Sequence, residues 1–225
     1  MLLARRRERL EELARELDAE FEVCDVADRE AVEQVAAAVL ERHPRVKLLV
    51  NNAGVGARTR FGDADPELVE RALRTNYLGS VWCLRAFLPG LEAAAPSRLV
   101  NVVSVAGTVA FAPSGPYAAS KHAQLAFSRA VASELPARGI RVLTVNPGFV
   151  HTEGFPNRDV LPGWMRPLVV EADDVAVHVL RALQRGRRET FVPGWYRVAA
   201  IAQALAPGAV AALLSRARYR TIRDR

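Results

Sequence analysis

Residues 99–121 of the 225-residue chain read LVNVVSVAGTVAFAPSGPYAASK, an apolar run followed by a loop and the start of a helical pattern. The run 99–104 is short and almost continuously apolar, which is typical of a strand that is buried on both faces. The pattern over 117–135 is long enough for a helix. Such a strand needs helices on both sides of its sheet, so this stretch indicates an α/β protein.

The same alternation of apolar runs and helical patterns continues on both sides of this stretch. It predicts one domain with a doubly wound, mostly parallel sheet flanked by helices. Asp28 is the predicted N-cap of one helix, because Ala31 and Val32 open an apolar face just after it. The other predicted strands are 2–4, 21–24, 46–50, 141–145 and a last one within 186–197, and the other predicted helices are 7–20, 28–42 and 66–91.

Tyr117, Lys121 and Ser104 form a potential proton-transfer group. Residues four apart on a helix share a face, so the Lys121 ammonium is within reach of the Tyr117 phenol. A free Tyr has a pKa of about 10, and a nearby positive charge lowers it toward the working range of an acid or base. Ser104 ends a strand, at the sheet edge where ligands of such folds bind. The chain has only two lysines, Lys47 and Lys121, so a Lys here indicates a need for a compact ammonium.

Composition narrows the class of protein. The net charge is +6, but many arginines alternate with Glu, as in RRRERLEELARELDAE (5–20), which indicates a solvated helix and not a nucleic-acid surface. Cys24 and Cys83 have no metal-ligand spacing, and we expect two buried free thiols and no metal site. No signal-peptide pattern follows the first residues, so the expected location is cytoplasmic.

Seven motifs, taken in order, resemble the short-chain dehydrogenases/reductases. They are LLARRRERL (2–10), CDV (24–26), NNAG (51–54), the Asn of RTNYLG (74–79), the Ser of VVSVAG (102–107), YAASK (117–121) and NPGFVHT (146–152). The resemblance covers nearly the whole chain and is clearest from residue 2 to 152. It implies a Rossmann-like fold and an NAD(P)-dependent oxidoreductase, which transfers hydride between the cofactor and a carbonyl or secondary alcohol.

The resemblance also implies roles for four catalytic residues. Tyr117 would be the acid/base that exchanges a proton with the substrate oxygen. Lys121 would lower the pKa of Tyr117 and hold the nicotinamide ribose, and Ser104 would polarise the substrate oxygen. Asn76 would anchor a water that relays protons from Lys121, although a helix-surface amide is the alternative for this residue alone.

Cofactor contacts follow from the same resemblance. Arg5 and Arg6 occupy the place where an acidic residue would select NAD(H), so they favour NADP(H) through its 2′-phosphate; solvated arginines are the alternative, and NAD(H) then remains open. His151 has no evident partner in the sequence and is interpreted as a packing or lid residue. The remaining contacts are Asp25 at the adenine, Asn51, Ala53 and Gly54 behind the adenosine, and Pro147, Gly148 and Thr152 at the nicotinamide, with Tyr117 and Lys121 also touching the cofactor.

One departure from the family pattern is serious. The family opens with a strand and a turn, usually TGxxxGxG, that receives the pyrophosphate, and this sequence has no such turn. The family's first strand is central in its sheet, between the second and the fourth. We therefore expect an N-terminally incomplete domain with unpaired strand edges, exposed apolar faces and weak NADP(H) binding. A non-catalytic binding protein that has lost its cofactor loop is the alternative.

The rest of the chain suggests how substrate and subunits are accommodated. Residues 153–170 take the place of a substrate lid, and its apolar side chains favour an apolar ketone, aldehyde or alcohol, unless the loop only packs on its own domain. The extension 198–225 is expected to form a helical pair on the core or on a partner subunit, with a surface-lying membrane contact as the alternative. The resemblance implies a homodimer or homotetramer through the helices 66–91 and 117–135. The named side chains are Phe155, Leu161, Trp164, Met165 and Leu168 in the lid, and Phe87, Phe127 and Val131 as subunit contacts or, alternatively, as core residues.

Overall fold

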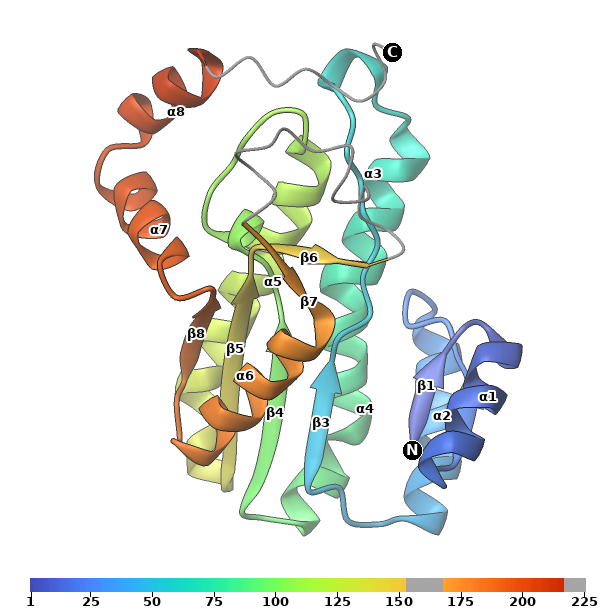
Figure 1. Cartoon of the computed structure of the whole chain (residues 1–225). Helices are drawn as coiled ribbons and strands as arrows, with labels where there is room; N and C mark the ends of the chain where they lie inside the picture. The colour runs from blue at the N-terminus through green and yellow to red at the C-terminus, as the bar shows by residue number, and fades with distance from the viewer. Residues whose placement is uncertain (153–167, 217–225) are drawn as a thin grey trace.

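A computed structural model describes residues 1–152 and 168–216 and shows parallel sheets flanked by helices (Figure 1). The centre is a four-stranded sheet in the order β3 (Leu48–Asn51), β4 (Ser97–Val102), β5 (Ile140–Pro147) and β8 (Glu189–Val192). Every strand pair in it is parallel, and β4 and β5 are aligned so that Val100 lies beside Leu143. The predicted α/β class is therefore confirmed.

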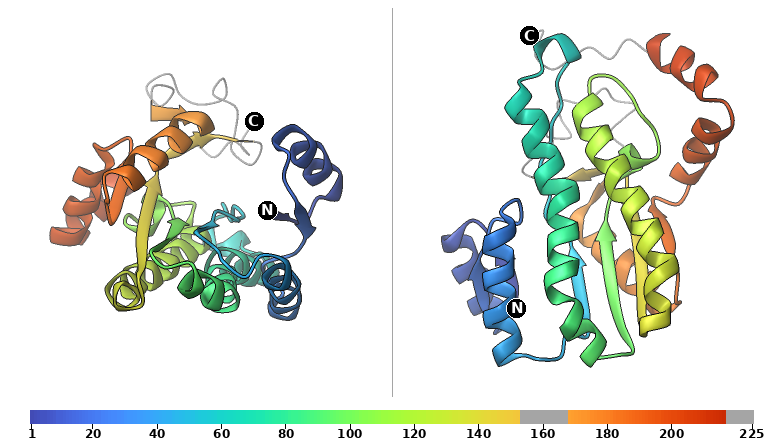
Figure 2. Two further views of the ribbon diagram at one scale, coloured as in Figure 1. Left: turned by 90° about the horizontal axis from the view of Figure 1, so that it is seen from below. Right: turned by 180° about the vertical axis from the view of Figure 1, so that it is seen from behind.

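The two faces of this sheet are covered by different helices, as Figure 2 shows from below. Leu99 and Val142 pack on one face against α4 (Gly79–Ala93) and α5 (Gly115–Glu134). Val100 and Leu143 point to the other face, where α6 (Ala172–Gln184) covers them. Neighbouring residues of a strand thus enter opposite cores, which explains the continuous apolar run of β4.

The N-terminal unit forms a second, separate sheet. It consists of β1 (Leu2–Ala4), α1 (Arg7–Leu17), β2 (Phe21–Val23) and α2 (Arg29–Arg42), and β1 pairs in parallel with β2 alone. The Asp28 side chain accepts a hydrogen bond from the Ala31 amide at 3.1 Å, which confirms the predicted N-cap. Helix α1 is shorter than predicted because Asp18, with φ 48°, ends it in a left-handed turn.

Both sheets lie on one layer of helices. Phe87 of α4 packs against Ala36 and Val39 of α2, and Leu3 of β1 and Leu49 of β3 lie on this cluster. Within the described parts of the chain, however, β1 and β3 share no hydrogen-bonded ladder. A cavity of about 2130 Å³ includes the space between them and continues to the carboxyl ends of the central strands.

This arrangement corrects one prediction about β3. The sequence predicts a strand buried on both faces, yet the side chains of Leu48 and Val50 are 44% and 46% exposed. Both side chains are exposed because one edge of β3 borders the cavity, and the described residues place no other strand beside that edge. The expected unpaired edges and exposed apolar residues are therefore present.

The long predicted helix 66–91 is composite. It consists of α3 (Pro66–Leu73), a π-helical turn η2 (Arg74–Leu78) and α4. Phe87 and Val131, considered as subunit contacts, are buried in the core of the monomer, and Phe127 is partly buried beside Val131. The short helical turns elsewhere are η1 (Phe61–Asp63), η3 (Val105–Gly107) and η4 (Leu135–Arg138).

The described chain continues beyond β5 with a short strand pair and, after β8, with two helices. Strand β6 (Phe149–His151) pairs with β7 (Val169–Glu171), and the lid side chains from Phe155 to Met165 lie outside the described residues. Helices α7 (Tyr196–Leu205) and α8 (Pro207–Arg216) carry residues that pack near Val109 and Phe111, as expected for a pair on the core. No single helix among the described residues has the length and apolarity to cross a membrane, although α7 and α8, bent by 116°, pass that test together.

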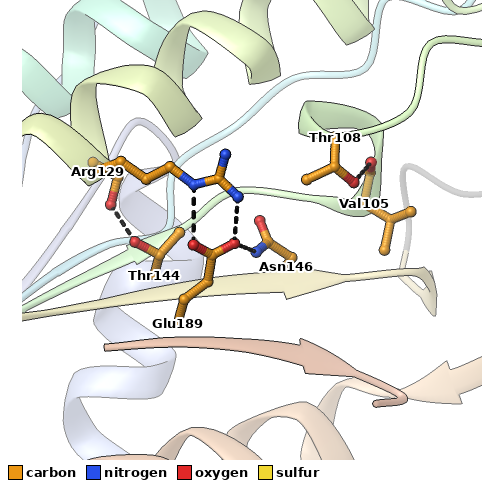
Figure 3. A network of polar contacts seen from close by, with 7 residues as sticks. Val105, Thr108, Arg129, Thr144, Asn146 and Glu189 are labelled. Atoms are coloured by element: carbon orange, nitrogen blue, oxygen red, sulfur yellow. Dashed lines mark hydrogen bonds and ion pairs between the residues drawn. The ribbon is translucent and has the colours of Figure 1, made fainter. Parts of the chain in front are cut away.

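An ion pair fixes α5 to the last strands of the sheet (Figure 3). Arg129 donates from Nε and Nη2 to the two carboxylate oxygens of Glu189, at 3.0 and 2.8 Å. The Asn146 amide of β5 donates to the same carboxylate at 3.0 Å. This contact holds the helix that carries Tyr117 and Lys121 in register with the strands.

Candidate active site

Three strand ends and the start of α5 meet at one end of the large cavity. The turn 52–55 follows β3, Ser104 follows β4 and Pro147 ends β5, and all of them line the cavity together with Tyr117 and Lys121. Parallel strands end at the same edge of a sheet, so residues far apart in sequence become neighbours there. The structure therefore brings the predicted catalytic residues together.

Tyr117 and Ser104 form the centre of this site. The Ser104 hydroxyl accepts a hydrogen bond from the Ala106 amide at 3.1 Å and donates one to the Pro147 carbonyl at 3.4 Å. It also lies close enough to the Tyr117 phenol to lower the pKa of that group. Thr108 closes the η3 turn behind Ser104 by donating to the Val105 carbonyl at 2.8 Å (Figure 3). These short turns fix the hydroxyl beside the phenol.

The pKa of Tyr117 differs from the sequence-based expectation. Burial raises its pKa above the ordinary value, and the hydrogen bond from Ser104 lowers it in part. The expected net lowering by Lys121 is not observed, because removing the phenol from water is the larger influence. At neutral pH the phenol is therefore protonated, the state that can donate a proton.

Lys121 lies one helical turn further along α5 and is 4% exposed. Its Nζ is 6.0 Å from the centre of the Tyr117 ring, and it donates to the Val102 carbonyl at 3.2 Å and to Gln124 Oε1 at 2.8 Å. Burial lowers the pKa of Lys121 to about 7. Its charge therefore changes within the physiological pH range.

Asn76 holds the turn 52–55 in place. It lies in the π-helical turn η2, is fully buried, and exchanges two hydrogen bonds with the Val55 backbone, at 2.7 and 3.0 Å. Its amide nitrogen also donates to Ser120 Oγ at 2.9 Å. A Cβ on Gly54 would lie 3.2 Å from Asn76 Oδ1, so a side chain here would require the Asn76 amide to move by a few tenths of an ångström. The alternative of a surface amide is wrong for Asn76.

The predicted cofactor residues line the same cavity, and several of their side chains have partners within the protein. The Asn51 amide is buried and donates to the Ser80 carbonyl and to Asn101 Oδ1, at 3.2 and 2.9 Å. Asp25 accepts from the Ala27 amide at 3.0 Å and lies 3.7 Å from Arg5, in an exposed pair that contributes little to stability. The cavity-lining members of the predicted set are Arg5, Arg6, Asp25, Asn51, Ala53, Gly54, Pro147, Gly148 and Thr152.

Some contacts at the site were missed by sequence reasoning. His151 does have a partner, because its Nδ1 lies 3.1 Å from the Glu171 carboxylate across the β6–β7 pair. Gln124 contacts Lys121, and its position three residues later on the same helix was the available signal. Tyr196 packs so closely on Gly148 that a Cβ there would lie 2.0 Å from its ring. Only the folded chain shows the first and last of these contacts.

The far wall of the cavity is apolar and aromatic. Val109 and Phe111 follow Ser104, and Phe149 follows Gly148. Trp195 and Tyr196, whose rings stack at 3.9 Å, extend this wall. No cluster of three or more potential metal ligands occurs in the described ranges 1–152 and 168–216. The arrangement thus places a protonated phenol and a serine hydroxyl beside an apolar space.

Comparisons with known proteins agree with this geometry. The model of the short chain dehydrogenase family matches residues 1–159. "Dehydrogenase/reductase SDR family member 7B" of Xenopus laevis is 30% identical over 98% of this chain and 75% of its own length, and the Bos taurus protein of that name is 33% identical over 68% and 50%. The chain spans about half the length of most of the curated relatives that it matches.

Solved structures give the same assignment. An alcohol dehydrogenase from Thermococcus sibiricus, complexed with 5-hydroxy-NADP, is 28% identical with a TM-score of 0.73, over 84% of this chain and 83% of that one. A short chain dehydrogenase from Burkholderia cenocepacia J2315 in complex with NADP has the same identity and TM-score over 86% and 78%. From its sequence motifs, its fold and these relatives, the chain belongs to the short-chain dehydrogenase/reductase family of oxidoreductases.

Proposed function

We propose that this protein reduces an apolar carbonyl compound, or oxidises the corresponding secondary alcohol, with NADP(H) as the hydride carrier. The observation that carries the proposal is the pairing of the buried Tyr117 phenol with Ser104 at the mouth of an apolar cavity, with Lys121 one turn away. The name of one relative, a Streptomyces virginiae "putative ketoacyl reductase" that is 38% identical over 60% of this chain, also favours a carbonyl substrate.

The residues present fit the cofactor in part. Gly54 and Gly148 both line the cavity, which extends from them to Arg5, although the Tyr196 ring occupies the space beside Gly148. The described residues contain no glycine-rich turn for the pyrophosphate. When bound, the nicotinamide would supply or accept the hydride. Lys121 and the turn 52–55 would hold the ribose, and Gly148 would face the nicotinamide.

The protein's own groups would move the proton. In the reductive direction the O–H bond of Tyr117 breaks and its proton passes to the substrate oxygen, which gains its negative charge as the hydride arrives at carbon. Ser104 donates a hydrogen bond that stabilises this oxygen. The tyrosinate left behind is stabilised by the Lys121 ammonium, and the reverse direction uses the same residues as a base.

Cofactor choice rests on the arginines next to β1. No acidic residue ends this strand, and Arg5 and Arg6, which follow it, would supply the cations for a 2′-phosphate. Two similar structures are NADP complexes, which supports NADP(H) for this chain. Arg5 would exchange Asp25 for the phosphate, because their pair is half-exposed and weak. NAD(H) is the alternative cofactor.

Partners and location remain predictions. We expect a small-molecule substrate, no nucleic-acid ligand and a cytoplasmic location. The expected homodimer or homotetramer would use the outer faces of α3, α4 and α5, since Phe87 and Val131 are already buried within the monomer. Membrane contact through α7 and α8 is the minority alternative.

The second candidate function is a non-catalytic binding protein. The observation that favours it is the cavity beside β3, where Leu48 and Val50 are exposed and the described chain offers no pyrophosphate loop. Tyr117, Lys121, Ser104 and Asn76 are all retained at one site, which favours the enzyme. We therefore rank the oxidoreductase first.

Turnover separates the two functions. The purified chain is mixed with millimolar NADPH and a panel of apolar ketones and aldehydes, and NADPH consumption is followed by absorbance. We expect turnover that Tyr117→Phe reduces by about 10²–10⁴-fold, because the proton donor is lost. Thr108→Ser is the matched control and should retain most of the rate. Turnover that survives Tyr117→Phe would contradict the assigned role, and no turnover with any carbonyl would favour the binding protein.

A further inference from the structure

Lys121 stands at the end of a chain of buried polar groups that the mechanism above does not use. Its Nζ donates to Gln124 Oε1 at 2.8 Å, and Gln124 Nε2 donates to Ser80 Oγ at 2.9 Å. Ser80 Oγ in turn donates to the Asn76 carbonyl at 3.3 Å. Gln124 is fully buried, and Ser80 is 4% exposed. The chain thus connects α5 and α4 with the π-helical turn.

The hydrogen bonds in this chain have only one self-consistent direction. A backbone carbonyl only accepts, so the Ser80 hydroxyl must be its donor. Ser80 then accepts from the NH₂ group of Gln124, and the carbonyl oxygen of Gln124 faces Lys121. Asn76 therefore fixes, through Ser80, which end of the Gln124 amide meets the ammonium.

We propose that Gln124, oriented by Ser80, is a positioning residue that keeps the Lys121 ammonium charged and one helical turn from Tyr117. A carbonyl oxygen at 2.8 Å favours the charged form of an amine, whereas burial disfavours it. A neutral amide suits this purpose, since a carboxylate would bind the ammonium as an ion pair and compete with the reaction. The inference rests on the proposed function for its catalytic meaning, but its physical basis is the contact itself.

Among the groups around Lys121, Gln124 is the side chain that accepts a hydrogen bond from its ammonium. Tyr117 faces it from α5, the Val102 carbonyl from β4, Gly54 from the turn after β3 and Ser80 from α4 through Gln124. Only Tyr117 among these groups titrates. Burial is the cause of the low pKa of Lys121, and no charged side chain of the described residues contributes to it.

A direct test is possible because the chain contains only two lysines. Lysine labelled with ¹³C at Cε gives one signal for Lys47 and one for Lys121, and the Lys121→Met variant assigns them. The Lys121 signal is titrated in the full chain without substrate. We expect Gln124→Met to lower its midpoint by about one pH unit, the size of one lost hydrogen bond to a charged group.

Two further variants give the sign of the effect. Ser80→Ala releases the Gln124 amide and should lower the midpoint less than Gln124→Met does. Gln124→Glu should raise the midpoint, since a carboxylate favours the ammonium. The control Ser128→Ala removes a buried hydroxyl of the same helix that bonds Thr144 and Asn101, and it should leave the midpoint unchanged.

The result separates this inference from the proposed function. A Lys121 midpoint that is the same in wild type, Gln124→Met and Gln124→Glu overturns the inference, as does an equal shift in Ser128→Ala. If Gln124→Met does not fold, Gln124→Glu and Ser80→Ala still predict opposite shifts. Absence of turnover in the wild type overturns the proposed function alone, because the titration needs no reaction. Where turnover occurs, the rise of kcat/KM with pH in alcohol oxidation should move to higher pH in Gln124→Met.

Discussion

At the scale of single residues, the site depends on how strongly burial opposes charge. Tyr117 keeps its proton because its surroundings exclude water, and Ser104 partly offsets that effect. Lys121 loses its proton more easily than a solvated lysine for the same reason. Burial thus brings the ammonium toward neutrality and holds the phenol in its acid form.

Replacing Ser104 by Ala should raise the pKa of Tyr117 further, because the hydrogen bond that lowers it is lost while burial remains. We expect kcat/KM to fall by about 10²-fold and its rise with pH in alcohol oxidation to move to higher pH. The measurement is a pH profile with one alcohol. Ser104→Thr is the matched variant and should preserve the profile; an unchanged profile in Ser104→Ala would refute the role of this hydroxyl.

Replacing Lys121 by Met should stabilise the fold near neutral pH. The pKa of Lys121 falls from 10.5 to about 7 on folding, so between these values the unfolded chain binds a proton that the folded chain lacks. Stability therefore rises with pH across this window, and the cost of burying Lys121 is full below it. We expect a gain of about 2 kcal/mol at pH 7, less than the pKa change alone implies because Gln124 loses its partner.

Urea unfolding at pH 7 and at pH 9.5 measures this gain. The difference between Lys121→Met and wild type should shrink at the higher pH, because the wild type gains stability as the pH rises from the folded toward the unfolded pKa of Lys121. Lys47→Met is the matched control, since its Nζ is only partly buried and donates to the Ala94 carbonyl. A Lys121→Met variant that is less stable than wild type at both pH values would contradict the argument.

At the scale of elements, the π-helical turn η2 and the turn after β3 act as one unit. The widened turn places the Asn76 amide against both backbone groups of Val55, and Gly54 leaves room for it. The turn after β3 is thus held by the helical segment η2 on one side and faces Lys121 on the other.

Gly54→Ala should disturb this unit. Its Cβ would lie 3.2 Å from Asn76 Oδ1 and 3.7 Å from Lys121 Nζ, so we expect a loss of about 1–2 kcal/mol of stability and slower turnover. Gly56→Ala is the matched control, because its Cβ would meet nothing within 4 Å and should be neutral or slightly stabilising. Urea unfolding and kcat/KM of both variants check this. Equal effects at the two glycines would contradict it.

The same elements show what the sequence could predict. The period of apolar residues located the strands β1 to β5 and the helices α1, α2 and α5, because local burial repeats with the geometry of each element. The exposure of Leu48 and Val50 could not be predicted, since it depends on whether another strand lies beside β3. The motifs also predicted that Ser104, Tyr117 and Lys121 lie together, and the structure places them at one site. The partners of Asn76 and His151 are long-range contacts and leave no local pattern.

At the scale of the whole molecule, two sheets share one helical layer but no strand ladder in the described parts of the chain. The pair β1–β2 has fewer hydrogen-bonded neighbours than β4 and β5. We expect hydrogen exchange of the β1 and β2 amides to be much faster than that of the β4 and β5 amides in the same experiment. Equal protection of the two sheets would show that they unfold as one unit.

The cavity between β1 and β3 should limit the affinity of the 225-residue chain for its cofactor. Exposed Leu48 and Val50 form part of its wall beside β3, and the described residues place no glycine-rich turn there. We expect NADPH to bind more weakly than micromolar in calorimetry, since the pyrophosphate gains few hydrogen bonds. Stoichiometric micromolar binding would refute this. The Arg5→Ala variant should bind NADP(H) still more weakly than the wild type does, whereas its affinity for NAD(H) should be unchanged.

The two cysteines give this molecule a chemical reporter of its own. Cys24 of the N-terminal unit and Cys83 of α4 share one small core, both as buried free thiols, and burial raises the pKa of Cys83 to about 12. Thiols react as thiolates, so alkylation of Cys83 in the closed molecule should be about 10³-fold slower than for a solvated cysteine. Each separation of the N-terminal unit from α4 would expose both thiols at once. The rate of thiol labelling would therefore report the rate at which the N-terminal unit separates from α4.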